Sequence, residues 1–235
     1  MEFDADVFER DGFFFFDSLV DAVACRDPSA QLDLQENRAA QRPQRHLIDR
    51  PAVIKLLANP ALINLIRAAV GVGAFAYKAT LFDKSTDANW LVAWHQDISI
   101  PVASRCDVPM WSGWSVKDGV NYMQPPSDVL SSLVALRIHL DECKASSGPL
   151  RVLKASHKLG RVPHEQCAAI AASHVRQIVT GKIGSALLMR PLVIHASSKA
   201  IATKRRRVLH LEFAAAELLG GLCWHRWVNY EGRLI

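Results

Sequence analysis

Residues 89–97 read Asn-Trp-Leu-Val-Ala-Trp-His-Gln-Asp, an apolar and aromatic-rich run that ends in His95-Gln96-Asp97. Such a run is typical of a β-strand. Side chains two positions apart on a strand point to the same face, so His95 and Asp97 are expected to lie side by side. The stretch therefore predicts a strand that presents a histidine and a carboxylate together.

A third ligand-type residue follows a similar run later in the chain. Residues 189–194, Met-Arg-Pro-Leu-Val-Ile, lead directly into His195. A His-x-Asp pair alone is weak evidence, but His95, Asp97 and His195 together make two histidines and one carboxylate. That set binds one face of ferrous iron and leaves open coordination positions, as in non-haem oxygenases. We therefore expect these three residues to be the metal ligands and the catalytic centre.

Three consecutive arginines precede the apolar, alternating segment from Val208 to Phe213. Strand alternation puts Arg206 on the opposite face from Arg205 and Arg207. A 2-oxo acid chelated to the metal needs a cation for its far carboxylate, and a guanidinium offers two parallel donors. We therefore expect Arg206 to point inward and hold the co-substrate.

Two hydroxyl residues are candidates for the same co-substrate site. Ser197, two positions past His195, can donate a second hydrogen bond to the carboxylate, and a turn serine explains it equally well. Thr80 shares a strand face with Lys78, and both can line the pocket. For Lys78, an ordinary polar position on the barrel is the simpler interpretation.

Length and composition bound the class of protein. The chain has 235 residues, of which 50% are hydrophobic and 22% charged, which fits one globular domain. No apolar stretch approaches the roughly 18 residues of a membrane span, and the acidic start does not resemble a signal peptide. Five scattered cysteines without a Cys-x-x-Cys pair favour a reducing, cytoplasmic location. The basic residues form no stripe interleaved with aromatics, so we expect no nucleic-acid or membrane partner and leave the oligomeric state open.

The hydrophobic pattern changes once along the chain. Residues 1–73 are expected to be mostly helical: Pro51 begins a helix, Asn59-Pro60 breaks it, and residues 7–24 are expected to be helical in their second half. Residues 74–215 show many short strands between turn residues, which predicts a mainly β fold with flanking helices, a β-sandwich or jelly roll. The expected strands are Phe75–Phe82, Trp90–His95, Ser132–Leu140, Leu150–Leu153, Val175–Val179, Ala186–Met189, Val193–Ala196 and Val208–Phe213.

Two stretches are not explained by core packing. One is the polar, glutamine-containing segment of residues 26–50, and the other is the insertion of residues 101–126 with Trp111 and Trp114. Long loops on a rigid β scaffold often carry specificity and lids. We expect both stretches to flank the metal beside a mainly apolar pocket. Trp111 and Trp114 are candidate substrate contacts, and core positions explain them about as well.

The remaining histidines are weaker candidates. His139 and Asp141 form a second same-face pair, but no later histidine with an arginine behind it completes a ligand set, so a structural role is favoured. A structural hydrogen bond is also favoured for His157. For His210 and His225 the sequence suggests no functional role.

These motifs together resemble the phytanoyl-CoA dioxygenase family of iron(II)/2-oxoglutarate oxygenases, particularly its small bacterial members. The similarity runs from about Tyr77 to Trp224. One departure is Lys154-Ala155, where the family commonly has Pro-Gly before Ser-His; this changes a turn and no ligand. The similar segments are Phe82-Asp83-Lys84, Trp94-His95-Gln96-Asp97, Trp114 to Lys117, Gln124-Pro125-Pro126, Arg137 to Asp141, Gly148 to Val152, Ser156-His157, Met189-Arg190-Pro191, His195 to Ser198 and Arg206-Arg207-Val208.

The resemblance implies one double-stranded β-helix (cupin-like) domain over residues 1–235, with iron(II) on His95, Asp97 and His195. It also implies 2-oxoglutarate anchored by Arg206, with dioxygen as the second co-substrate. Halogenating relatives replace the carboxylate ligand with a small residue, so Asp97 favours hydroxylation or a related oxidation of a small organic molecule or natural product, with release of succinate and CO2. Two alternatives stay open: a cupin-like isomerase or hydrolase with zinc or manganese, which would not need Arg206, and a non-catalytic β-sandwich binding protein.

Overall fold

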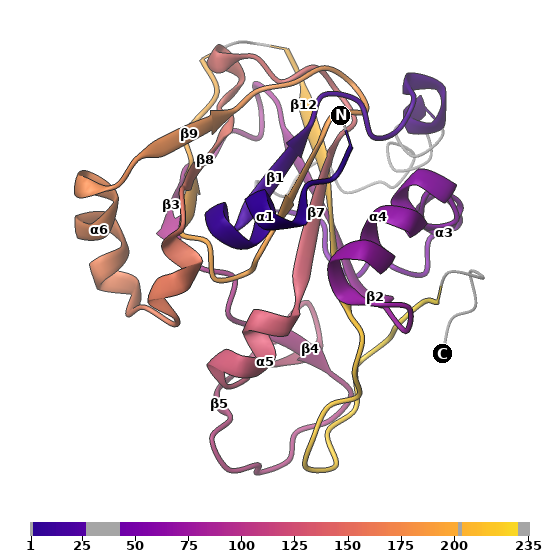
Figure 1. The fold of residues 1–235 in the computed structure, drawn as a ribbon, viewed down its shortest axis with the longest axis vertical. Coiled ribbons are helices and arrows are strands. Elements are labelled where there is room, and N and C mark those ends of the chain that lie inside the picture. The colour runs from indigo at the N-terminus through magenta and orange to yellow at the C-terminus, as the bar shows by residue number, and fades with distance from the viewer. Residues whose placement is uncertain (1, 27–42, 202–203, 230–235) are drawn as a thin grey trace.

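The computed structural model describes residues 2–26, 43–201 and 204–229. Two antiparallel sheets face one another: a five-stranded sheet in the order β1-β10-β7-β12-β2 and a four-stranded sheet in the order β3-β11-β8-β9 (Figure 1). A smaller sheet, β4-β6-β5, lies at the bottom of Figure 1. The fold is therefore the mainly β jelly roll with flanking helices that the sequence predicts.

Eight of the twelve strands in the described residues overlap the predicted ones, and β8 and β10 have the predicted bounds; β1, β4, β5 and β6 were not predicted. The strands are β1 (Phe13–Phe16), β2 (Phe75–Lys84), β3 (Val92–His95), β4 (Ile100–Val102), β5 (Ser112–Lys117), β6 (Val120–Gln124), β7 (Val134–His139), β8 (Leu150–Leu153), β9 (Arg176–Val179), β10 (Ala186–Met189), β11 (His195–Ser197) and β12 (Arg206–Ala214). The α-helices are α1 (Ala5–Asp11), α3 (Pro51–Leu57), α4 (Pro60–Val70), α5 (Ser127–Ser132) and α6 (Cys167–Ser173), with short 3-10 turns at Ala145–Ser147, Ser156–Leu159 and His164–Gln166.

Strand β12 shows how the sequence builds the two faces of the large sheet. Leu209, Leu211 and Phe213 join the main hydrophobic core, which α3 and α4 cover from outside. The intervening side chains point into the space between the two sheets, where Arg206, His210 and Glu212 line a cavity. Because alternate side chains of a strand point to opposite faces, one strand supplies both the core and the site.

The N-terminal part differs from the expectation in one respect. The helix expected in the second half of residues 7–24 is present only from residue 22, and Phe13–Phe16 instead form β1, which pairs with β10. A continuous apolar run has no period that separates a helix from a buried strand. The break at Asn59 is as predicted, and the Asn59 side chain accepts hydrogen bonds from the first turn of α4.

Two further expectations concern the loops and membranes. Residues 27–42, which include most of the glutamine-containing segment, lie outside the described residues. The insertion of residues 101–126 is not a plain loop, because it contributes to β4 and forms β5 and β6. No single helix in the described part is long and apolar enough to cross a membrane; the bent pair α3–α4 meets that test by length and composition alone.

Candidate metal centre

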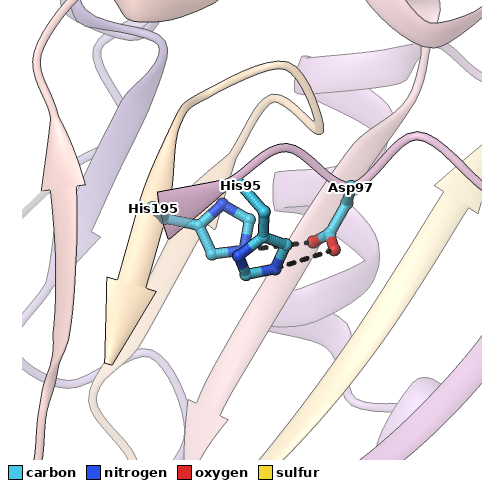
Figure 2. Close-up of side chains that lie close together, drawn as sticks. All are labelled: His95, Asp97 and His195. Atoms are coloured by element: carbon cyan, nitrogen blue, oxygen red, sulfur yellow. Dashed lines mark ion pairs between the residues drawn. The ribbon is translucent and has the colours of Figure 1, made fainter. Parts of the chain in front are cut away.

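The three predicted ligands lie close together at neighbouring strands of the four-stranded sheet. His95 ends β3 and His195 begins β11, and the two residues are directly paired in the antiparallel ladder. Asp97 follows His95, with Nε2 of His95 3.7 Å and Nε2 of His195 3.5 Å from its carboxylate oxygens (Figure 2). One ligand atom from each residue lies within 4.8 Å of the other two. This spacing fits a single metal ion.

Backbone contacts orient both imidazoles. Nδ1 of His95 lies 2.8 Å from the Ala93 carbonyl oxygen, and Nδ1 of His195 lies 2.8 Å from the Val193 carbonyl oxygen. A carbonyl oxygen can only accept, so each Nδ1 carries the proton and donates. The lone pair of each Nε2 is then free to face Asp97, which is the arrangement of a metal-binding histidine.

The protonation states also suit a divalent cation. Burial, with a further contribution from His95, lowers the pKa of His195 to about 3. Burial opposes ionisation of Asp97, but the electrostatic effect of the neighbouring His195, His210, His95 and Lys78 outweighs it and lowers the pKa of the carboxyl group. At neutral pH His195 is therefore a neutral imidazole and Asp97 a carboxylate, the forms in which these groups bind metal.

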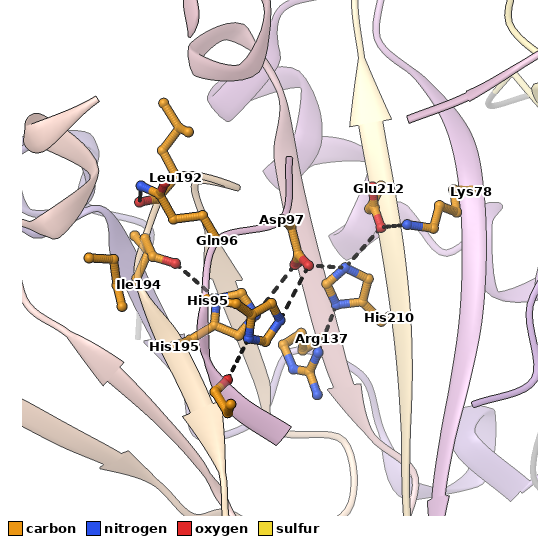
Figure 3. A network of polar contacts seen from close by, with 12 residues as sticks. Lys78, His95, Gln96, Asp97, Arg137, Leu192, Ile194, His195, His210 and Glu212 are labelled. Atoms are coloured by element: carbon orange, nitrogen blue, oxygen red, sulfur yellow. Dashed lines mark hydrogen bonds and ion pairs between the residues drawn. The ribbon is translucent and has the colours of Figure 1, made fainter. Parts of the chain in front are cut away.

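The side chain of Gln96, which lies between the two ligands in the sequence, forms hydrogen bonds with backbone groups of two neighbouring segments. Its amide nitrogen donates to the carbonyl oxygens of Leu192 (2.7 Å; Figure 3) and Gly160 (2.8 Å), and its amide oxygen accepts from the backbone N–H of Val162 (2.8 Å). Strand alternation predicts that Gln96 points away from the side that His95 and Asp97 share, and these backbone contacts agree with that prediction, although Gln96 also borders the cavity. The backbone N–H of Asp97 donates to the Pro191 carbonyl oxygen at 3.0 Å. The ligand-bearing segment is thus tied to its neighbours on both sides.

The cluster opens into a cavity of about 380 Å³ between the sheets. This volume lies within the range of ligand pockets, about 300–1,000 Å³. Six of its 21 lining residues in the described part of the chain are apolar, yet apolar atoms form slightly more of the wall than polar atoms do. The wall is therefore mixed, with apolar atoms predominating only slightly, as compared with the mainly apolar pocket expected from the sequence. The apolar lining residues are Pro43, Phe82, Trp90, Val92, Ile98 and Leu150.

One end of the cavity carries two buried cations. Arg206 is 3% exposed; its Nη2 donates to the Gly148 carbonyl oxygen at 3.2 Å, and its Nε has no hydrogen-bond partner in the described part of the chain. Lys84, paired with Arg206 across the β2–β12 ladder, donates to Ser197 Oγ at 3.1 Å and to the Ser198 carbonyl oxygen at 2.6 Å. Neither cation forms an ion pair with a described carboxylate, so this end is suited to bind an anion.

The structure also places the other residues that the sequence analysis considered for the co-substrate site. Ser197 is buried beside Lys84, and Thr80 lines the cavity with its buried hydroxyl unpaired among the described atoms. Arg205 and Arg207 point the other way, to ion pairs with Asp83 (2.5 Å) and with Asp141 (2.8 Å) respectively. The guanidinium, the ammonium and the Ser197 hydroxyl fit one carboxylate of 2-oxoglutarate, whose other end would reach the metal. Thr80 is paired with His210 in the β2–β12 ladder and so lies closer to the metal ligands.

The sequence reasoning missed a row of polar side chains beside the metal ligands (Figure 3). Arg137 Nη1 lies 2.9 Å from Nδ1 of His210. Because arginine only donates, this Nδ1 accepts, so Nε2 of His210 carries its hydrogen 3.1 Å from Glu212 Oε1. Glu212 also pairs with Lys78 at 2.6 Å. Counting alternate residues from Arg206 would have found His210 and Glu212.

Several weaker candidates are resolved by their contacts. Lys78 lines the cavity, against its simpler interpretation as an ordinary barrel residue. His139 bonds with Ser185, and His157 contacts the Glu9 carbonyl oxygen, in the structural roles expected. His210 lines the cavity, so the view that it has no role at the site is wrong.

The two tryptophans of the insertion do not line the cavity in the described structure. Trp111 and Trp114 pack against a hydrophobic cluster that includes Tyr77 and Ile100. Their predicted contact with substrate therefore has no support from this arrangement and stays a prediction. The insertion does reach the cavity through Lys117, and the segment after residue 42 reaches it through Pro43 and Arg45.

The sequence of the chain matches a known family and a known enzyme. The family model described as phytanoyl-CoA dioxygenase (PhyH) matches residues 8–208. L-proline trans-4-hydroxylase from Streptomyces griseoviridis is 23% identical over 215 residues, which are 80% of this chain and 72% of that protein.

Solved structures share the fold at lower identity. EctD from S. alaskensis, with 2-oxoglutarate and 5-hydroxyectoine, has a TM-score of 0.67 and 18% identity, over 90% of this chain and 74% of its own. The epimerase SnoN from nogalamycin biosynthesis, in complex with Fe3+, α-ketoglutarate and nogalamycin RO, has a TM-score of 0.65 and 14% identity, over 90% of this chain and 82% of its own. The family model covers most of the chain, and the chain therefore belongs to the phytanoyl-CoA dioxygenase family.

Proposed function

We propose that this protein is an iron(II)- and 2-oxoglutarate-dependent dioxygenase that hydroxylates a small organic molecule and releases succinate and CO2. One observation carries the proposal: the cluster of His95, Asp97 and His195 opens into a cavity, and Arg206 is buried at the far end of that cavity. Arg206 forms no ion pair with any described carboxylate. A metal chelate of a dicarboxylic 2-oxo acid needs both features together.

Each residue has a stated task in this proposal. His95, Asp97 and His195 hold the iron. Arg206 binds the far carboxylate of 2-oxoglutarate with help from Ser197, and Thr80, opposite His210 in the ladder, contacts the co-substrate nearer the metal. Iron(II) with 2-oxoglutarate supplies dioxygen activation coupled to decarboxylation. The protein's part is to orient the co-substrate and the target carbon and to restrict water between the sheets.

The relatives support this class of reaction. The curated relative is named as a hydroxylase of an amino acid, and SnoN was solved with Fe3+ and α-ketoglutarate. HygX from Streptomyces hygroscopicus, with a TM-score of 0.63 at 12% identity over 89% of this chain and 85% of its own, was solved with nickel and 2-oxoglutarate. A zinc or manganese isomerase or hydrolase would leave Arg206 and Lys84 without an evident use. The five cysteines are free, in keeping with a reducing compartment; a cytoplasmic location remains a prediction.

The test is iron-dependent conversion of 2-oxoglutarate to succinate. Under anaerobic conditions, iron(II) and 2-oxoglutarate should together produce the visible charge-transfer band of the chelate, and air with a substrate should release succinate. His95→Ala and Asp97→Ala should abolish both signals, because each removes a ligand. His164→Ala and Asp87→Ala are matched controls on exposed residues and should keep them. Full activity in either ligand variant contradicts the assignment.

A further inference from the structure

The cavity has more positively charged side chains than the binding of iron and 2-oxoglutarate requires. Among the described residues that line it, six are lysines or arginines, whereas only Asp97 and Glu212 are acidic. The two charges of iron(II) are offset by the two carboxylates of 2-oxoglutarate. A positive excess therefore remains in a partly enclosed, low-dielectric space, where it attracts anions strongly.

The positively charged side chains lie mainly toward two ends of the cavity. Arg206 pairs with Lys84 at the start of β12, and six residues later Glu212 pairs with Lys78 in the same ladder. At about 3.3 Å per residue, these two positions are roughly 20 Å apart along the strand. His210, whose Nε2 lies 3.9 Å from Asp97 Oδ2, stands between them on β12. With 2-oxoglutarate between Arg206 and the metal, the Lys78 end is left for the substrate.

At the Lys78 end the insertion supplies another cation, Lys117 of β5. The amino groups of Lys117 and Lys78 lie 4.5 and 5.6 Å from the centre of the same ring, that of Tyr122. Lys117 forms no ion pair with any described acid, and the buried Tyr122 hydroxyl has no hydrogen-bond partner in the same set of residues. Arg45 lines the same region and pairs with the half-exposed Asp118 at 3.2 Å.

Glu212, the only acid that lines this end in the part of the chain that the structure describes, is not available to a substrate. One of its oxygens accepts from Tyr77 Oη at 2.9 Å, and the other contacts Lys78 and His210 at 2.6 and 3.1 Å. A cationic group would therefore find no free carboxylate here, whereas an anionic group would meet Lys117 and the adjoining Lys78. Burial, together with the charges of Lys78 and Arg45, lowers the pKa of Lys117, so a bound anion would also relieve this repulsion.

We propose that the substrate is a small organic anion, a carboxylic acid or a phosphate ester, whose charged group binds Lys117 and Lys78 at the end of the cavity opposite Arg206. This inference rests on the proposed oxygenase function and adds the substrate class. Because 2-oxoglutarate occupies part of the 380 Å³, the substrate should be about the size of an amino acid and not a polymer.

The experiment is a panel of matched compounds tested with iron(II) and 2-oxoglutarate. Each small carboxylic acid is paired with its uncharged amide and, where one exists, with the corresponding phosphate ester, and succinate release is measured. The acids or the phosphate esters should stimulate release, and the amides should not. For the best compound, Lys117→Gln should raise the KM by about 10- to 100-fold, as expected for loss of a charge-assisted hydrogen bond. The same substitution should change the KM for the oxo-acid co-substrate less.

Two further variants make the result specific. Lys117→Arg keeps the charge and should recover most of the affinity, and Lys182→Gln removes a charge from an exposed lysine outside the cavity as the matched control. Stimulation by uncharged compounds at least as strong as by anions, or equal KM values in Lys117→Gln and Lys182→Gln, overturns the inference.

A binding measurement covers the case in which no compound turns over. The melting temperature of the protein with manganese(II) and 2-oxoglutarate, recorded without oxygen, should rise with anions of the panel and not with their amides. Absence of any anion-dependent rise overturns the inference. Failure to bind iron and 2-oxoglutarate at all would instead count against the proposed oxygenase function, so the two failures are distinguishable.

Discussion

The buried His139 makes stability depend on pH in a way that one substitution should remove. Its side chain lies on β7 at 4% exposure, with Nδ1 2.8 Å from Ser185 Oγ. The Ser185 hydroxyl itself donates to the Lys182 carbonyl oxygen at 2.7 Å, so its oxygen accepts from His139, which is therefore the neutral Nδ1–H form. Burial lowers the pKa of His139 to about 4, and Arg137 and Arg206 add to the effect.

The direction and size of this pH dependence follow from the difference between the pKa of His139 in the folded protein and in the unfolded chain. Above pH 6.5 the imidazole is neutral in both states and contributes no pH dependence. As the pH falls below 6.5, the unfolded chain takes up a proton that the folded protein excludes until about pH 4, so the free energy of unfolding decreases. At 1.36 kcal/mol per pKa unit the whole window costs about 3 kcal/mol, of which about 2 kcal/mol is lost by pH 5.

The substitution is His139→Asn, because the asparagine amide can donate near the position of Nδ1 but does not titrate. Denaturant unfolding at pH 7.5 and pH 5.0 gives the free energy of unfolding for both proteins. His139→Asn should be less stable at pH 7.5, since it leaves a small cavity, but on acidification it should lose about 2 kcal/mol less than the wild-type protein. The other histidines are common to both proteins and cancel in this difference.

The control is His164→Asn, which replaces an exposed histidine and should leave the pH dependence as in the wild-type protein. An equal loss of stability on acidification in the wild-type protein and in His139→Asn would refute the reasoning. It would mean that His139 is protonated in the fold despite its burial and the adjacent arginines.

Three further predictions concern the site and its supports. Arg206→Ala should raise the 2-oxoglutarate KM about 100-fold or more while iron binding is nearly intact, as measured by succinate release and metal titration; the same phenotype in Arg205→Ala instead would show that the inward-facing residue is misassigned. Gln96→Ala removes three hydrogen bonds behind the ligands and should lower the free energy of unfolding by about 2–4 kcal/mol and weaken iron binding, whereas unchanged iron affinity would mean that the ligands are held independently of it. Gly184→Ala places a Cβ 1.9 Å from the Val20 carbonyl oxygen at a φ of 82°, so the melting temperature should fall by several degrees; an unchanged melting temperature would show that this turn relaxes freely.

Period-two alternation made much of the site predictable from the sequence. It put His95 and Asp97 on one face of their strand and separated Arg206 from Arg205 and Arg207. The helix break at Asn59 was equally readable, because a proline cannot continue the preceding helix and an asparagine caps the next one. These features depend on neighbours within a few residues, so the sequence by itself determined them.

Other parts depended on which strands meet. The run Phe13–Phe16 is apolar on both sides, and only its pairing with β10 makes it a strand. Lys84 and Arg137 become part of the cavity because β2 and β7 flank β12 on either side. Trp111 lies against a hydrophobic cluster and not in the cavity, and that cluster is formed by residues distant in the sequence, such as Tyr77 and Trp224.

The physical reason is the same in each case. Local chemistry decides which face of a strand a side chain occupies, through alternation and conformational preference. The partner opposite that face comes from a segment far away in the sequence, as with Lys78 and Glu212, which are distant in the chain but 2.6 Å apart in space. The metal ligands could therefore be predicted from the sequence. The charge balance of the cavity, and with it the inferred substrate class, depends on how the two sheets pack against each other, which only the tertiary structure shows.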